Sequence, residues 1–225
     1  VNEIEAVEEE NKKQSDTIES DDKFKSIELK NIDVNTVGTL TKDEGGLGYD
    51  MWSGSKRNVI KNYLENLPIN RESNLAIELI KKLLLSNADV PESKDQKNDL
   101  ILIRINKLIE LGDFENAKSL IDLIVNNNNE EILMKQVQIN LSLNNFDLVC
   151  SDIDEKRKNY KQNLFWRKVE IFCQILNSET NKANLSLTLL KEDNNFNDIN
   201  FITIIDSLIY KEEISNQNFD NLDLL

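Results

Sequence analysis

The residues that could do chemistry in this chain are few. The sequence has no histidine and only two cysteines. Nucleophiles activated by histidine and most zinc sites are therefore excluded, because both need an imidazole or a larger set of thiolates. Asp152 and Asp154 lack the rest of a calcium-binding loop. We therefore expect no catalytic residue, no metal and no cofactor, and hence a protein that is not an enzyme.

The two cysteines are the remaining reactive pair. Each lies on an apolar helix face, and the turn between the two helices is predicted near Tyr160–Gln162. Counted from Lys161, Cys150 is 11 residues back and Cys173 is 12 residues forward, so an antiparallel hairpin brings them to the same height. A disulfide and two buried free thiols both fit this placement. Because helix axes usually lie about 8–10 Å apart, we favour free thiols.

Glycine is concentrated in one short segment. Five of the six glycines lie between Gly38 and Gly54. Glycine is needed where the backbone takes a positive φ or approaches another surface closely, so residues 32–54 are predicted to form one specially shaped segment. Large side chains beside the glycines are expected to fasten it to a hydrophobic surface. The expected docking residues are Gly45, Gly46, Leu47, Gly48, Met51, Trp52 and Gly54, with Tyr49 as a further anchor.

The end of this segment offers one ligand-binding alternative. Ser53–Arg57 precedes a predicted helix, where free N–H groups and two cations could hold an anion. The glycines do not match either of the common nucleotide-binding patterns. We therefore favour a capping and docking turn with Ser55 as the helix cap, and keep a small-ligand or anion binder as a third hypothesis.

Charge excludes two classes of partner. The formal net charge is −14, and residues 1–50 contribute −8 of it. Nucleic acid and anionic membrane surfaces repel such a chain. No apolar run reaches the length of a membrane span. Residues 1–31 are so polar that we predict a disordered acidic tail.

Everything after the glycine segment has the pattern of helices. Helices are predicted from Ser55 to about Leu67 and from about Arg71 to Ser86, followed by a linker near 87–99. A stretch from Leu111 then recurs from Leu143, 32 residues on, and a weaker third copy has Leu176, Ala183 and Leu187 about 33 residues further on.

A period in the low thirties built of helix–turn–helix units is typical of tetratricopeptide-like repeats. The predicted fold is therefore all-α, a tetratricopeptide-like α-solenoid of antiparallel helix pairs over 55–225, with the docked glycine-rich segment and the acidic tail before it. The apolar face around Trp166 is assigned to core packing, with a partner groove as the alternative.

The string GTLTKDEGGLGYDMWSG, followed by Leu83–Ser86 at the end of the second helix, resembles a group of alphaproteobacterial envelope proteins often labelled "antifreeze glycopeptide polyprotein". The similar residues are Gly45, Gly46, Leu47, Gly48, Met51, Trp52 and Gly54. The resemblance covers about 55 residues. It implies an exported protein with a helical-repeat body, in which the start at Val1 follows removal of a signal peptide. It implies no activity.

Two functions follow as expectations. The first is a non-enzymatic scaffold or adaptor that binds a protein or peptide partner in the periplasm or cell envelope, because helical-repeat arrays present extended binding faces. The alternative is a helical module of a larger cell-wall enzyme whose catalytic region lies outside this sequence. A cytoplasmic location is the alternative to export.

Overall fold

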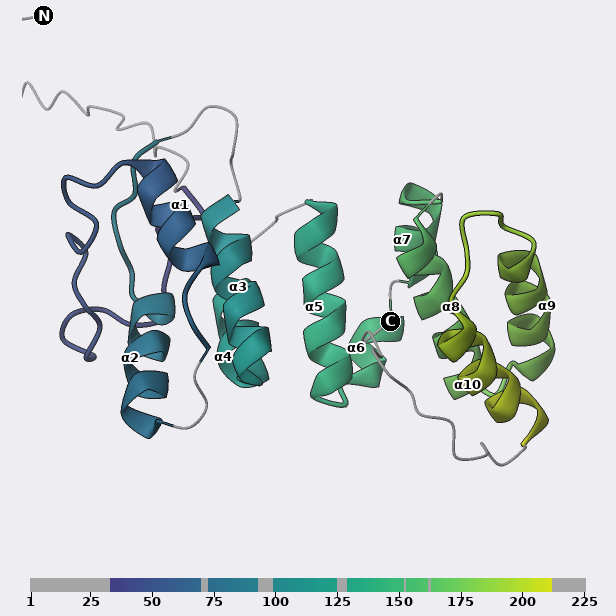
Figure 1. The fold of residues 1–225 in the computed structure, drawn as a ribbon. Helices are drawn as coiled ribbons and strands as arrows, with labels where there is room; N and C mark the ends of the chain where they lie inside the picture. The colour runs from purple at the N-terminus through teal and green to yellow at the C-terminus, as the bar shows by residue number, and fades with distance from the viewer. Residues whose placement is uncertain are drawn as a thin grey trace, which may run out of the picture. The chain divides into compact units, whose positions relative to one another are not determined.

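The computed structural model describes residues 33–69, 73–92, 99–124, 129–151, 153–161 and 163–211. The predicted tail, residues 1–31, lies outside this range. The described residues form ten α-helices and no strand, so the all-α prediction is confirmed (Figure 1). They belong to one compact unit that begins at Asp33. The helices are α1 (Arg57–Glu65), α2 (Asn74–Leu85), α3 (Asp99–Leu111), α4 (Phe114–Asp122), α5 (Glu130–Ser142), α6 (Phe146–Cys150), α7 (Ile153–Asn159), α8 (Leu164–Leu176), α9 (Thr180–Lys191) and α10 (Ile199–Tyr210).

The first helix begins later than the sequence indicated. Lys56 occupies the N-cap position of α1 and no side chain accepts a hydrogen bond there, so the prediction that Ser55 caps this helix is wrong. At α2, by contrast, the Ser73 hydroxyl accepts from the Ala76 amide at 3.3 Å. Both helices pack against α3, which carries six buried residues.

Residues 87–92, at the start of the predicted linker, are part of the packed structure. The amide of Asn87 donates to the Leu40 carbonyl at 2.9 Å, and the amide of Ala88 donates to Thr36 at 3.1 Å. Ala88 and Val90 are buried. A polar run with a proline looks like a linker in the sequence, but here its main chain is paired with the glycine-rich segment.

Three helical hairpins share one turn geometry. The pairs α3/α4, α5/α6 and α8/α9 are each joined through a residue with a left-handed backbone: Gly112 (φ 76°), Asn144 (φ 59°) and Ser178 (φ 61°). In each turn this residue donates to the carbonyl three positions back, and the next residue donates to the carbonyl five positions back. This is the Schellman pattern that satisfies the last carbonyls of a helix. The three residues are 32 and 34 positions apart.

Counting from these turns places equivalent side chains in the core. Two residues before each turn and two residues after it are buried in every hairpin. Relative to the turn, the buried sets are Leu100, Ile132 and Trp166; Ile105, Val137 and Ile171; Ala117, Val149 and Ala183; and Ile121, Ile153 and Leu187. In the structure, Asn177 of the third hairpin therefore corresponds to Leu143 of the second. The sequence alignment had placed Leu176 at this position, one residue earlier.

Within the described part of the chain, the hydrophobic core consists of three clusters that share helices. The first cluster holds buried residues of α1–α5, the second those of α5–α8, and the third those of α8–α10. Helix α5 contributes Ile132 and Ile139 to the first cluster and Val137 to the second. Helix α8 contributes Trp166 to the second and Ile171 to the third. Each shared helix therefore has two apolar faces, one toward each cluster.

One predicted helix is divided. Helix α6 ends at Cys150 and α7 begins at Ile153, so the helix that was expected to carry Cys150 on an apolar face is interrupted at Ser151. Two acidic residues stand in the first turn of α7, where the helix dipole favours negative charge. The local sequence thus supports a new helix start at this point.

Candidate functional site

The glycine-rich segment lies along the end of α2. Leu40 and Ser86 form an isolated parallel bridge: the Leu40 amide donates to Leu85 at 3.0 Å, and the Asn87 amide donates to Leu40 at 2.9 Å. The Ser86 hydroxyl accepts from the Leu47 amide at 2.8 Å and donates to Lys82 at 2.6 Å. Ser86 is fully buried. Main-chain pairing, rather than side-chain packing alone, therefore fixes the segment to the helix end.

Two glycines are required because the two main chains approach so closely. A Cβ on Gly38 would collide with the main chain of Leu85, Ser86 and Asn87, and one on Gly46 would come within 2.8 Å of the Leu40 carbonyl. Of the other predicted docking glycines, Gly45, Gly48 and Gly54 all have positive φ. The segment therefore uses glycine both for close approach of two main chains and for positive φ, as the sequence predicted.

The predicted anchors divide into two groups. Met51 and Trp52 are half-buried, and Trp52 packs against the first core cluster with its ring edge-on to Tyr63 at a centroid distance of 6.1 Å. Leu47 and Tyr49 are 40% and 56% exposed. Tyr49 is therefore no side-chain anchor; its contribution is the carbonyl, which accepts from the Asp89 amide at 2.7 Å.

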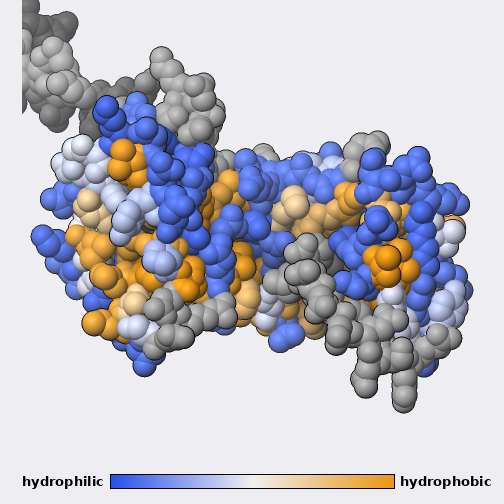
Figure 2. Space-filling model, in the orientation of Figure 1, coloured by the Kyte–Doolittle hydropathy of each residue, from blue (hydrophilic) through white to orange (hydrophobic). Residues whose placement is uncertain are grey.

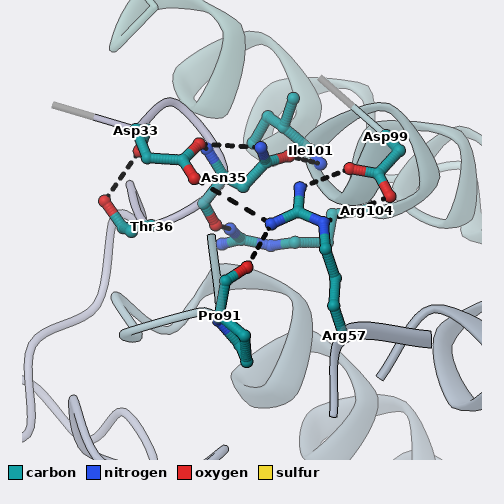
Figure 3. A network of polar contacts seen from close by, with 8 residues as sticks. All are labelled: Asp33, Asn35, Thr36, Arg57, Pro91, Asp99, Ile101 and Arg104. Atoms are coloured by element: carbon teal, nitrogen blue, oxygen red, sulfur yellow. Dashed lines mark hydrogen bonds and ion pairs between the residues drawn. The ribbon is translucent and has the colours of Figure 1, made fainter. Parts of the chain in front are cut away.

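A buried arginine, which the sequence analysis missed, fastens the segment to α3 (Figure 3). Arg104 is 5% exposed, and its guanidinium donates to four main-chain carbonyls. Its Nε contacts Leu84 at 2.6 Å and its Nη2 contacts Ser86 at 3.1 Å, both at the end of α2. Its Nη1 contacts Asn35 at 3.3 Å and Val37 at 2.7 Å. One side chain thus joins the glycine-rich segment, α2 and α3.

This arrangement keeps a charge buried without a carboxylate. Burial lowers the pKa of Arg104 to about 10, still well above neutral pH, so the guanidinium stays charged. The carbonyls at the C-terminal end of α2 carry the negative end of its helix dipole, which favours a cation there. The Arg104 side chain is enclosed, and all four carbonyls that accept from it are main-chain groups. We therefore assign Arg104 a structural role.

A second polar group closes the start of α3 (Figure 3). The Asn35 side chain accepts from the Ile101 amide at 2.9 Å, and the Asn35 Nδ2 donates to Asp33 at 2.7 Å. Asn35 thus supplies a cap to α3 from 66 positions earlier in the chain. It is 1% exposed. The sequence does show a charged arginine, Arg104, within the apolar run of α3. It does not show which main-chain carbonyls accept hydrogen bonds from that arginine, because every residue has a carbonyl.

The same junction argues against the anion-site alternative. Arg57, one of its two proposed cations, forms an ion pair with Asp99 and also donates to the Pro91 carbonyl at 2.7 Å. A second carboxylate, Asp33, lies 3.9 Å from Arg57. An incoming anion would have to displace these partners and would meet two carboxylates.

The two cysteines are joined. Cys150 and Cys173 form a disulfide with a Cα–Cα distance of 5.6 Å. The sequence analysis favoured free thiols from the usual spacing of helix axes, whereas here the short α6 approaches α8 closely enough for the bond. Trp166, Val169 and Cys173 are buried in the second cluster, as expected for core packing.

The described residues contain no group of three or more side chains suited to hold a metal ion. None of the helices in the described part of the chain has the length and apolar character to cross a bilayer. No protein-family model matches this chain, and neither a similar curated protein nor a similar solved structure is found.

Proposed function

We propose that this chain is a non-enzymatic scaffold or adaptor, a tetratricopeptide-like α-solenoid that binds a protein or peptide partner. The recurrence of one turn geometry at Gly112, Asn144 and Ser178 carries the proposal. Stacked helix pairs with a fixed period present equivalent residues at regular intervals, which suits them to an extended partner.

Two further observations support a repeat. The small or β-branched residues Ala117, Val149 and Ala183 are at most 1% exposed and occupy the same position after each turn. Helix α10 ends at another left-handed residue, Lys211 (φ 56°), which is 33 positions after Ser178. The spacing of the four turn residues therefore stays in the low thirties, as in helix-pair repeats.

The exposed surface suits a protein partner better than a polyanion. In Figure 2, apolar areas lie among polar ones over α2 and over α10. Leu75 and Leu79 of α2 are 77% and 57% exposed, and Leu208 and Tyr210 of α10 are 50% and 57% exposed. A chain with a net charge of −14 repels phosphate backbones. Mixed apolar and polar surface is common where proteins bind each other.

The cell envelope is the proposed location. The Cys150–Cys173 disulfide supports it, because such bonds persist in oxidising compartments and are rare in the cytosol. The resemblance of the glycine-rich segment to exported proteins supports it independently.

Site-specific photo-crosslinking in extracts of the source cell's envelope fraction tests the binding function. A crosslinker is placed singly at equivalent positions before each turn, and in a second set at equivalent positions after each turn. The sets are Glu110, Ser142 and Leu176, and Glu115, Asp147 and Asn181. We expect all three positions of one set to capture the same protein while the other set captures little. Capture from one hairpin alone, or equal capture by both sets, would contradict an extended repeat surface.

The alternative, a helical module of a larger cell-wall enzyme, is tested on the gene. A catalytic region in the same open reading frame would favour the alternative. Its absence, together with the crosslinking result above, would favour the adaptor.

A further inference from the structure

The disulfide borders a solvent-accessible hollow of about 390 Å³. The hollow lies where α6, α7, α8 and the start of α9 meet. Both cysteines contribute to its wall, and the charged residues around it are Asp154, Glu170, Glu179 and Lys182. A small thiol entering this hollow therefore arrives beside the sulfur–sulfur bond.

The two sulfurs are unequal in their surroundings. Cys173 is 2% exposed and belongs to the second core cluster together with Trp166 and Val169. Cys150 is half-buried, at the C-terminal end of α6, and is only packed against that cluster. An external nucleophile therefore reaches Cys150 more readily than Cys173.

The charge around the hollow selects among nucleophiles. Three carboxylates and one ammonium group line it. Glu179 is paired with Lys182 at 2.7 Å, and Glu170 is paired with Arg157 at 2.9 Å. Asp154 is exposed and adds a further negative charge at the start of α7. A thiol that carries a second negative charge is repelled here, whereas one that carries an ammonium group is attracted.

We propose that Cys150 is a thiol–disulfide exchange site, selective for small cationic or uncharged thiols over anionic ones. The external thiolate attacks Cys150 Sγ, and a new sulfur–sulfur bond forms there. The Cys150–Cys173 bond breaks, and its electron pair leaves on Cys173 Sγ, which takes a proton from water. The external sulfur is oxidised to the disulfide level, and Cys173 is reduced to a thiol. The exchange is independent of the proposed partner binding.

A series of three thiols of similar size tests the selectivity on the full 225-residue chain. The thiols are cysteamine, 2-mercaptoethanol and 2-mercaptoethanesulfonate, used at equal thiolate concentration. Each rate is divided by that thiol's rate with 2-hydroxyethyl disulfide, which is uncharged. At 0.01 M salt we expect cysteamine to exceed mercaptoethanesulfonate by about fivefold or more. At 1 M salt the ratio should approach one, because the Debye length falls from about 30 Å to about 3 Å.

The position of the adduct gives a second readout. After the remaining thiol is alkylated, peptide mass spectrometry should find the added thiol on Cys150 and the alkyl group on Cys173. Asp154→Asn should reduce the ratio of cationic to anionic rates, while Glu155→Gln, an exposed neighbour outside the hollow, should leave it unchanged. Adducts on Cys173, a ratio near one at low salt, or two free thiols in the isolated protein would each overturn the proposal.

Discussion

Arg104 shows how one side chain can hold three parts of a structure together. Its three guanidinium nitrogens donate to Leu84, Ser86, Asn35 and Val37, which belong to α2, the residue after it and the glycine-rich segment. A lysine could not replace it, because the planar guanidinium offers five donors in fixed directions and an ammonium group offers three on a flexible stem. The same junction places the main chain of Gly38 against that of Ser86.

Arg104→Met should lower the free energy of unfolding by about 1–3 kcal/mol, because it leaves buried main-chain carbonyls without a donor. Urea unfolding followed by circular dichroism measures the loss. Lys182→Met is the control: its side chain is 67% exposed, and we expect a change within about 0.5 kcal/mol. Equal stabilities of the two variants would show that the buried guanidinium contributes nothing.

Gly38→Ala tests the close approach. A Cβ there meets main-chain atoms that cannot move without breaking the pairing of Leu40 with the end of α2, so we expect a loss of about 2–4 kcal/mol. Gly45→Ala is the matched comparison, because its φ is +91° but nothing lies within 4 Å of the added atom. It should cost only about 1–2 kcal/mol from backbone strain. Denaturant unfolding measures both losses, and we expect the larger one for Gly38→Ala. A larger loss for Gly45→Ala would contradict the geometry.

At the scale of helices, the sequence predicted some features and not others, for physical reasons. Apolar spacing predicted the helices, since a helix must bury one face wherever it packs. The pairing of Cys150 with Cys173 could be considered from the sequence because residues equally far from the turn of an antiparallel hairpin lie at the same height. The Arg104 contacts could not be predicted, because carbonyl groups look the same at every position. The break after Cys150 was missed because Val149, Cys150 and Ile153 still fit one helical face.

Ala117 tests the helix packing. Its side chain has no exposed surface, so Ala117→Leu should overpack the first hairpin and cost about 1–3 kcal/mol. Ser119→Leu introduces the same side chain two positions later at an exposed site and should change stability by no more than about 0.5 kcal/mol. Thermal unfolding of both variants gives the comparison. If the two melt at the same temperature, the assigned position of Ala117 between helices is wrong.

Two helix caps predict a loss of stability in acid. Asp113 caps α4 and pairs with Lys81, and Asp198 caps α10 and pairs with Lys168. Burial alone would raise the pKa of each carboxyl group, but the hydrogen bonds to the lysine and to the helix amides outweigh it and the pKa is lowered. Each cap therefore stabilises the fold fully above the ordinary carboxyl pKa, and this contribution is lost as the pH falls through the lower folded value.

Unfolding midpoints measured between pH 7 and pH 2 check this. We expect Asp113→Asn and Asp198→Asn to be less stable than the parent protein near pH 7, and the difference to shrink as the pH falls. A difference that stays constant across this range would show that the two carboxylates do not supply the pH dependence.

For the whole molecule, the three core clusters are connected through the shared helices α5 and α8. A disturbance in one cluster can therefore reach the next through the helix that they share. The Cys150–Cys173 bond adds a covalent link within the second cluster, between α6 and α8. It therefore strengthens the part of the core that contacts both of the others.

Removing this link should be measurable in the intact chain. The bond closes a sequence separation of 23 residues, for which the chain-entropy model gives about 3 kcal/mol. The double variant Cys150→Ala, Cys173→Ala should lose roughly this amount in urea unfolding. Thiol titration in denaturant should find no free thiol in the parent protein before reductant and two after it. Two thiols before reductant would remove the basis of the expected loss.

The disulfide also determines how the molecule responds to a mechanical load. If force is applied to the two ends, the residues between Cys150 and Cys173 cannot lengthen the chain. Fully extended they would span about 75 Å, at about 3.3 Å per residue, whereas the closed loop spans only 5.6 Å between its Cα atoms. Helix α7 and much of α8 lie within that loop, so tension bypasses them while the bond is intact. Reduction would release this hidden length, making the oxidation state a control on how far the chain can stretch.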